Sequence, residues 1–266
     1  IRVEEYERKD ITREDALALR EKLGIAEDET MLLSLSRISY EKNIQAIVQQ
    51  FPDVLGQNKA VKLVVVGDGP YLSDLKKMVE DLDIEDSVIF TGMVAHEETA
   101  IYYKAADFFI SASTSETQGL TYTESLASGT PVIAHGNPYL DDIIDQKMFG
   151  TLFYQEEDLA NAILDAIENT PAMADKAYQA KMYAISAEHF GKSVYAFYLD
   201  VLISAKNKKK EKFSLTVRGQ KEKTSVKLAH SAIKLPAEAA KATVKTSAKV
   251  FKAPKRLINS IRDFLD

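Results

Sequence analysis

The chain has 266 residues, 45% hydrophobic and 28% charged, which is enough for one large or two small domains with a buried core. It contains no cysteine, which excludes disulfides, thiolate metal sites and cysteine nucleophiles, and its 4 histidines are not spaced like metal ligands. No apolar run reaches the roughly 20 residues that a membrane-spanning helix needs.

The net charge of −6 conceals two oppositely charged parts. Residues 1–204 hold 17 Lys and Arg against 35 Asp and Glu, whereas residues 205–266 hold 17 against 5. This division predicts an acidic domain over 1–204 and a basic tail over 205–266. The first residues are charged and do not begin with Met, so they do not resemble a signal peptide, and we expect the chain to start inside a longer protein.

Short apolar runs alternate with helical patterns along the acidic domain. Such runs are typical of strands buried on both faces of a parallel sheet, and the alternation predicts a doubly wound, Rossmann-like α/β fold with right-handed crossovers. The expected strands are 31–36, 62–66, 87–91, 107–112, 131–134 and 150–153. The expected helices are 43–55, 70–82, 96–105, 119–128, 139–146, 156–168, 172–188 and 191–205.

The ligand site of such a sheet lies beyond the carboxyl ends of its strands. The loop after the first strand holds Arg37 and Lys42, a planar fork and a mobile point charge that together suit a diphosphate. The alternative is that both are solvated loop cations.

A second loop, after the strand at 107–112, holds two carboxylates that flank the start of a helix. Glu116 and Glu124 enclose residues 118–121, whose free backbone N–H groups attract phosphate. The carboxylates themselves could accept hydrogen bonds from sugar hydroxyls. The alternative is that acidic residues simply favour the positive end of a helix.

The turn Gly67-Asp68-Gly69-Pro70 suggests a dinucleotide fingerprint, but it lacks a third glycine at the required spacing. Proline at a helix start explains the turn, so we do not expect an NAD site. A Rossmann-type oxidoreductase domain remains a distant alternative.

Taken in order, these loops resemble the retaining glycosyltransferases of family 4. Residues 113–134 are similar to that family's Glu-x7-Glu signature, and residues 36–43 to its diphosphate-binding Arg-x4-Lys loop. Residues 64–70 and 90–94 fall in the family's order and spacing, so the resemblance covers about residues 30–168. It implies the donor-binding half of a two-domain GT-B enzyme, whose N-terminal half would carry most of the acceptor site.

The resemblance also implies roles for individual residues. Arg37, Lys42 and Glu116 would be catalytic, the first two holding the diphosphate and the third contacting the transferred sugar. Glu124 would bind the ribose, and Met93 and Val94 would approach the base. The candidate donor-binding residues are Gly67, Met93, Val94, Gln118, Gly119, Leu120, Thr121 and Glu124. Such enzymes retain anomeric configuration and need no metal, so the resemblance implies no cofactor besides the nucleotide sugar.

The variant Glu-Thr-Gln-Gly-Leu-Thr at 116–121, followed by residues 136–142, resembles bacterial enzymes that glucosylate diacylglycerol. It implies transfer of a hexose, expected to be glucose, from a UDP-sugar to diacylglycerol or a glycosyl-diacylglycerol. The chain alone would then bind nucleotide but transfer little, and would expose apolar side chains near Tyr195, Phe197 and Tyr198. The alternative is a non-catalytic nucleotide-sugar-binding module docked on an anionic membrane.

The basic tail predicts a membrane contact. Pro236 and Pro254 interrupt it, so we expect a helix near 237–253. On a helical wheel drawn over the tail, seven cations gather on one side: Lys227, Lys234, Lys241, Lys245, Lys249, Lys252 and Arg256. A basic amphipathic helix is typical of a peripheral anchor on anionic lipid, here at the cytoplasmic face of the cell membrane. Nucleic acid is not expected because aromatic side chains are scarce, and the alternative is that the tail wraps the acidic domain.

Overall fold

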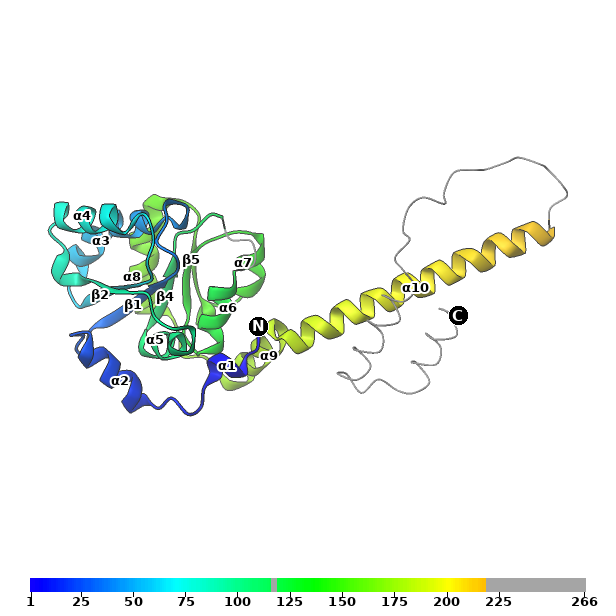
Figure 1. Cartoon of the computed structure of the whole chain (residues 1–266), viewed down its shortest axis with the longest axis horizontal. Coiled ribbons are helices and arrows are strands. Elements are labelled where there is room, and N and C mark those ends of the chain that lie inside the picture. Colours follow the sequence, from blue (N-terminus) through cyan, green and yellow to red (C-terminus); the bar gives the residue numbers. More distant parts are fainter. Residues whose placement is uncertain (116–118, 219–266) are drawn as a thin grey trace. The chain divides into compact units, whose positions relative to one another are not determined.

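The computed structural model describes residues 1–115 and 119–218, with side chains up to residue 205. A single parallel sheet of six strands organises this part of the chain, in the order β3-β2-β1-β4-β5-β6 (Figure 1). Every predicted strand is confirmed, each end within one residue. The strands are β1 (Thr30–Leu35), β2 (Val61–Val66), β3 (Val88–Gly92), β4 (Phe108–Ser111), β5 (Val132–His135) and β6 (Gly150–Phe153).

Helices cover both faces of the sheet, which explains why the strands are continuous apolar runs. One face packs on α3 (Ile44–Gln57), α4 (Leu72–Asp81) and α8 (Leu159–Asn169). The other packs on α1 (Glu4–Glu7), α2 (Arg13–Lys22), α5 (Thr99–Ala105), α6 (Leu120–Ala127), α7 (Pro138–Ile143) and α9 (Asp175–Ile185). The predicted doubly wound α/β class is therefore confirmed.

Side chains of one strand alternate between these two cores. Leu32 points to the α3 side, whereas its neighbours Met31 and Leu33 point to the α5 side, and all three are fully buried. Burying one such side chain contributes about 1.5–3 kcal/mol, so this alternation along the strands supplies much of the stabilisation of the sheet.

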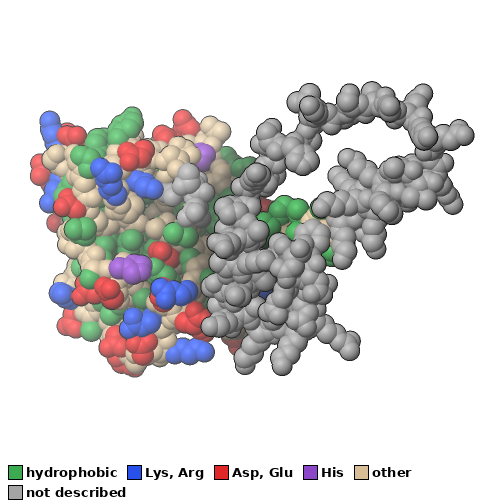
Figure 2. Space-filling model, turned by 45° about the vertical axis from the view of Figure 1, so that its right-hand side comes forward, with side chains coloured by type: hydrophobic (Ala, Val, Ile, Leu, Met, Phe, Trp, Pro, Cys, Tyr) green, Lys and Arg blue, Asp and Glu red, His purple; other side chains and the backbone are tan. Residues whose placement is uncertain are grey.

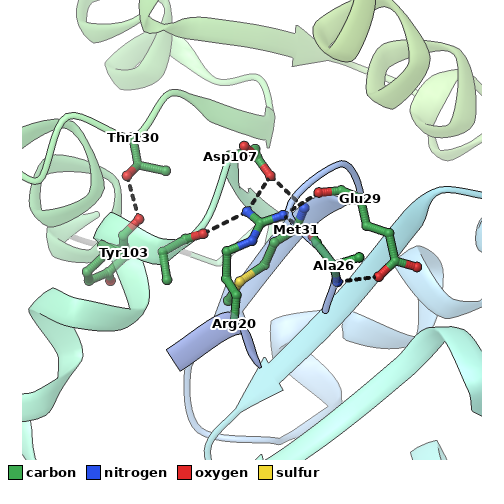
Figure 3. Close-up of polar contacts among 8 residues, drawn as sticks. Arg20, Ala26, Glu29, Met31, Tyr103, Asp107 and Thr130 are labelled. Atoms are coloured by element: carbon green, nitrogen blue, oxygen red, sulfur yellow. Dashed lines mark hydrogen bonds and ion pairs between the residues drawn. The ribbon is translucent and has the colours of Figure 1, made fainter. Parts of the chain in front are cut away.

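A buried arginine ties the amino ends of β1 and β4 together (Figure 3). Arg20 of α2 donates from Nη1 to the carbonyl of Ala105 at 3.1 Å and to Asp107 Oδ2 at 3.0 Å. The same carboxylate oxygen accepts the backbone N–H of Met31 at 2.7 Å, and Arg20 Nη2 donates to the carbonyl of Glu29. This network lies at the edge of the sheet opposite the loops that follow the strands.

Two helices near the N-terminus were not anticipated from the sequence. The start of α2 is a capping box, in which Thr12 Oγ1 accepts the N–H of Asp15 at 3.2 Å and Asp15 Oδ2 accepts the N–H of Thr12 at 2.9 Å. The pattern Thr-x-x-Asp was therefore a usable signal.

The long helix α10 (Ala187–Arg218) also differs from expectation, because the predicted helix ended at residue 205. No proline or glycine follows Gly191 before residue 219, and Lys is a good helix former, so the change in charge does not end the helix. The described residues divide into two units between Leu202 and Ile203, and the first contains the whole sheet. No helix among the described residues is both long and apolar enough to span a bilayer.

Candidate functional site

The strand order reverses between β1 and β4, and in a parallel sheet every loop after a strand lies at the same edge. The loops after β1, β2, β3 and β4 therefore lie at one edge, as the sequence predicted, and the loop after β5 lies there as well. Hydrogen bonds and close backbone contacts join neighbouring loops into one continuous surface, described below from β2 to β5.

Two glycines bring the loop after β2 against the loop that carries Arg37. Gly67 has a φ of +139°, and a Cβ there would lie 1.9 Å from the carbonyl oxygen of Ser36. A Cβ on Gly69 would lie 2.1 Å from the carbonyl oxygen of Ile38. The N–H of Ile38 donates to the carbonyl of Asp68 at 2.9 Å. These glycines therefore support the backbone on both sides of Arg37. This close packing explains why glycine stands at both positions of the turn, and no dinucleotide-binding role is needed to explain them.

Asn43 ties the same loop to the segments that follow β4 and β6, in the other half of the sheet. It has left-handed backbone (φ 52°), which asparagine tolerates well, and it precedes α3. Its Nδ2 donates to Glu156 Oε1 at 2.7 Å and to the carbonyl of Ala112, after β4, at 3.3 Å. The hydroxyl of Ser115 donates to the carbonyl of Glu41 at 3.3 Å. The loop with Lys42 is therefore fixed beside the loop that leads to Glu116.

Arg37 and Lys42 occupy different settings in this loop. Arg37 is exposed, whereas Lys42 is half-buried in a short 3-10 turn (Tyr40–Lys42). On the face of the molecule in Figure 2, side chains of both charges are interspersed, so the acidic excess of residues 1–204 is not gathered there into one patch.

Gly119 is the N-cap residue of α6, and its φ of +56° directs the chain into the helix. A Cβ there would lie 2.8 Å from the rings of both Tyr122 and Tyr139, so the two tyrosines enclose this glycine. Leu120 and Thr121 follow in the first turn, where backbone N–H groups have no partner within the helix. Gly119, Leu120 and Thr121 therefore lie at the N-terminal end of α6, and their role in binding an anion stays a prediction.

Glu124 lies one turn further along α6 and is half-buried. The hydroxyl of Tyr103, a fully buried residue of α5, donates to Glu124 Oε2 at 3.1 Å. After β3, Met93 is 80% exposed, whereas Val94 packs partly on the core.

Two of the predicted site residues, Glu116 and Gln118, lie outside the described residues. So do all the predicted membrane-binding residues, which are Lys227, Lys234, Lys241, Lys245, Lys249, Lys252 and Arg256. Three further residues were not anticipated: Asn43, Tyr103 and Tyr139. Asn43 carried a local signal, because asparagine often precedes a helix. Tyr139 lies within the segment 136–142 that carried the resemblance but had no role assigned, and Tyr103 had no local signal.

Within residues 1–115 and 119–205, no group of three or more Asp, Glu and His side chains could hold a metal ion.

Solved structures share this fold. HepE from Anabaena, in complex with UDP and glucose, superimposes with a TM-score of 0.64 at 23% identity, over 75% of this chain and 55% of HepE. The C-terminal domain of the group 1 glycosyl transferase LpcC from Francisella tularensis has a TM-score of 0.59 at 20% identity, over 70% of this chain and 99% of that domain. The fold is that of the C-terminal domain of a GT-B glycosyltransferase.

The sequence comparison places the chain within one family. Residues 15–183 match the family model of the glycosyl transferases group 1, and the chain belongs to that family. It is 56% identical over 264 residues to the alpha-monoglucosyldiacylglycerol synthase of Streptococcus pneumoniae, which covers 99% of this chain and 58% of that enzyme. The chain therefore spans little more than half the length of this relative. The predicted resemblance to family 4 glycosyltransferases is confirmed.

Proposed function

We propose that this chain is the donor-binding half of a retaining glucosyltransferase that transfers glucose from UDP-glucose to diacylglycerol. The observation that carries this proposal is the 56% identity to an alpha-monoglucosyldiacylglycerol synthase over 99% of the chain. The fold shared with HepE, which binds UDP and glucose, supports a UDP-sugar as donor. A glycosyl-diacylglycerol as acceptor, or galactose in the donor, would be an outcome of the assay below.

Arg37 and Lys42 would hold the donor diphosphate. The carbohydrate C1–O bond breaks with its electron pair going to UDP, so negative charge develops on the β-phosphate as the acceptor oxygen bonds to C1 on the same face. A guanidinium and an ammonium at that position stabilise the charge most in the transition state. The proton of the acceptor hydroxyl passes to the departing phosphate oxygen, which balances the step.

The remaining roles are those that the resemblance to family 4 implies for these loops. The N–H groups at Gly119, Leu120 and Thr121 would bind phosphate beside the positive end of α6. Glu124, one turn later, would accept hydrogen bonds from the ribose. The loop with Met93 and Val94 would contact the base. Gly67 would support the neighbouring loop, which carries Arg37. Glu116 would contact the transferred sugar, next to Gln118.

We propose two partners besides the substrates. The first is an N-terminal GT-B half, because α10 exposes large apolar side chains: Phe190 is 71%, Phe197 is 64% and Tyr198 is 62% exposed. Exposure at Phe197 and Tyr198 was predicted, whereas Tyr195 is half-buried. The second partner is the anionic surface at the cytoplasmic face of the membrane, contacted by the basic residues of 205–266.

The test is a transfer assay on the protein that carries both halves, with radiolabelled UDP-glucose or UDP-galactose and vesicles containing diacylglycerol or glucosyl-diacylglycerol. We expect a labelled glucosyl-diacylglycerol with retained configuration. Arg37→Ala, Lys42→Ala and Glu116→Ala should each lower kcat by about 100-fold or more, because they remove charge stabilisation or sugar contact.

Lys59→Ala is the matched control, since Lys59 is an exposed cation before the amino end of β2, at the opposite edge of the sheet. Its activity should equal that of the unaltered protein. Saturable UDP-glucose binding without transfer to any lipid would favour the non-catalytic module. Transfer that survives Arg37→Ala and Lys42→Ala unchanged would contradict the assigned donor site.

A further inference from the structure

Glu124 is held by a hydrogen bond from a side chain of another helix. The Tyr103 hydroxyl of α5 reaches Glu124 Oε2 at 3.1 Å, and Tyr103 is fully buried. Its backbone is also fixed, because the hydroxyl of Thr130 donates to the Tyr103 carbonyl at 2.6 Å (Figure 3). Tyr103 therefore has little freedom to move away from the carboxylate.

A second tyrosine comes from the N-terminal segment. Tyr6 of α1 is 4% exposed, and its ring meets the ring of Tyr103 edge-on at 6.2 Å between centroids. It meets His96, which follows the loop with Met93 and Val94, at 6.2 Å. Tyr6 thus lies between the Glu124 carboxylate and the loop assigned to the base.

The electrostatics keep both tyrosines protonated. Burial raises the pKa of Tyr6 and of Tyr103 well above the ordinary value, and the nearby Glu124 carboxylate raises each further. Both phenols therefore remain hydrogen-bond donors across the physiological pH range. A carboxylate accepts several hydrogen bonds, so donors on its protein side leave capacity for a ligand.

The N-terminal segment that carries Tyr6 is itself anchored. The N–H of Ala187, the first residue of α10, donates to the carbonyl of Ile1 at 2.7 Å. A displacement at the start of α10 would therefore be passed to the segment that leads to Tyr6.

We propose that Tyr103 and Tyr6 are positioning residues that orient the Glu124 carboxylate toward the ribose of the nucleotide. This inference rests on the proposed donor site. Without the Tyr103 donor, and without the Tyr6 phenol beside it, Glu124 can adopt several side-chain conformations, and ordering it on binding weakens affinity. Through Tyr6, nucleotide affinity also depends on the anchored N-terminal segment.

The experiment is calorimetric titration of the chain with UDP and with 2′,3′-dideoxy-UDP. We expect Tyr103→Phe to weaken UDP binding about threefold to tenfold, as for loss of one hydrogen bond to a carboxylate, and Tyr6→Phe, which removes a phenol close to that carboxylate, to weaken it by a smaller factor. Neither should change affinity for the dideoxy nucleotide, which lacks the ribose hydroxyls. Combined with Glu124→Ala, each phenylalanine substitution should have no further effect on UDP affinity.

Tyr178→Phe is the matched control. It also removes a partly buried hydroxyl that contacts α6, at 2.8 Å from the carbonyl of Ala127 at the far end of the helix. It should leave affinity for both nucleotides unchanged, and circular dichroism should show that all variants are folded.

The outcomes separate the inference from the proposed function. If the chain binds UDP and Glu124→Ala weakens it, but Tyr103→Phe and Tyr6→Phe bind like the unaltered chain or weaken both nucleotides equally, the positioning role is wrong while the donor site stands. If Glu124→Ala leaves UDP affinity unchanged, the ribose role and the positioning role both fail. If the folded chain and the protein with both halves fail to bind UDP, the proposed function fails as well.

Discussion

Gly69 offers a direct test of how the loop with Arg37 is held. In Gly69→Ala the new Cβ would lie 2.1 Å from the Ile38 carbonyl oxygen and 2.7 Å from its carbon. Carbon and oxygen atoms normally approach no closer than about 3.3 Å, so the two backbones must separate by about 1 Å. That shift lengthens two hydrogen bonds at Ile38, now 2.9 Å to Asp68 and 3.2 Å from Tyr71, beyond useful range.

The cost can be worked from these contacts. Overpacking against a buried backbone costs about 1–3 kcal/mol, and each of the two weakened hydrogen bonds about 1 kcal/mol, so we expect about 3–5 kcal/mol of lost stability. For a domain of this size the Tm should fall by about 6–20 °C. Arg37, the neighbour of Ile38, should move enough to weaken UDP binding about tenfold, the equivalent of one charge-assisted hydrogen bond.

The assay pairs thermal unfolding with calorimetric titration of UDP. Gly56→Ala is the control, because Gly56 lies in α3 with no atom within 4 Å of the added Cβ. That substitution should raise stability by about 0.5–1 kcal/mol and leave UDP affinity unchanged. A Gly69→Ala chain with the unaltered Tm and UDP affinity would refute the reasoning that this glycine supports the Arg37 loop.

Three other outcomes are expected. Arg20→Met should lower the free energy of unfolding by about 2–4 kcal/mol, because the Asp107 carboxylate and several carbonyls lose the Arg20 donor. UDP affinity should stay within about twofold. An unchanged denaturation midpoint would contradict this. Asn43→Ala should weaken UDP binding about threefold to tenfold by releasing the loop with Lys42, and equal affinity would show that the loop is held by other contacts. Burial and, second, a nearby glutamate raise the pKa of Tyr178 to about 12, so its contribution to stability is present below pH 10 and is lost as the pH rises toward 12. Tyr178→Phe should make that decline shallower in denaturant titrations, and an identical slope would contradict the assignment.

The proposed membrane contact is tested by deletion of residues 219–266. The deleted form should be recovered less from flotation with anionic vesicles than the whole chain, with the difference falling as salt is raised. Equal recovery of the two forms would contradict a role for these basic residues. Neutral vesicles provide the control for lipid binding that does not depend on charge.

Much of the fold was predictable because a parallel sheet covered on both faces leaves strong local signals. Strands such as Val61–Val66 must be apolar throughout, and glycines mark the turns that follow. The candidate site was predictable for the same reason, since the carboxyl ends of parallel strands share one edge and Arg37, Gly119 and Glu124 all follow such ends. The helix α2 was missed although its capping box was local, and α10 was placed too short because a change in charge was taken as a boundary.

The sequence by itself determined the order of strands and helices along the chain, the family, and which charged residues lie at the edge of the sheet where the strands end, because each depends on spacing along the chain. Only the tertiary structure decided which distant residues support that edge. Gly69 meets the backbone of Ile38, and Tyr6 and Tyr103 meet near Glu124, although each pair is far apart in sequence. Such contacts depend on how helices and loops pack on the finished sheet, and a glycine or a buried tyrosine carries no local mark of the partner it will meet.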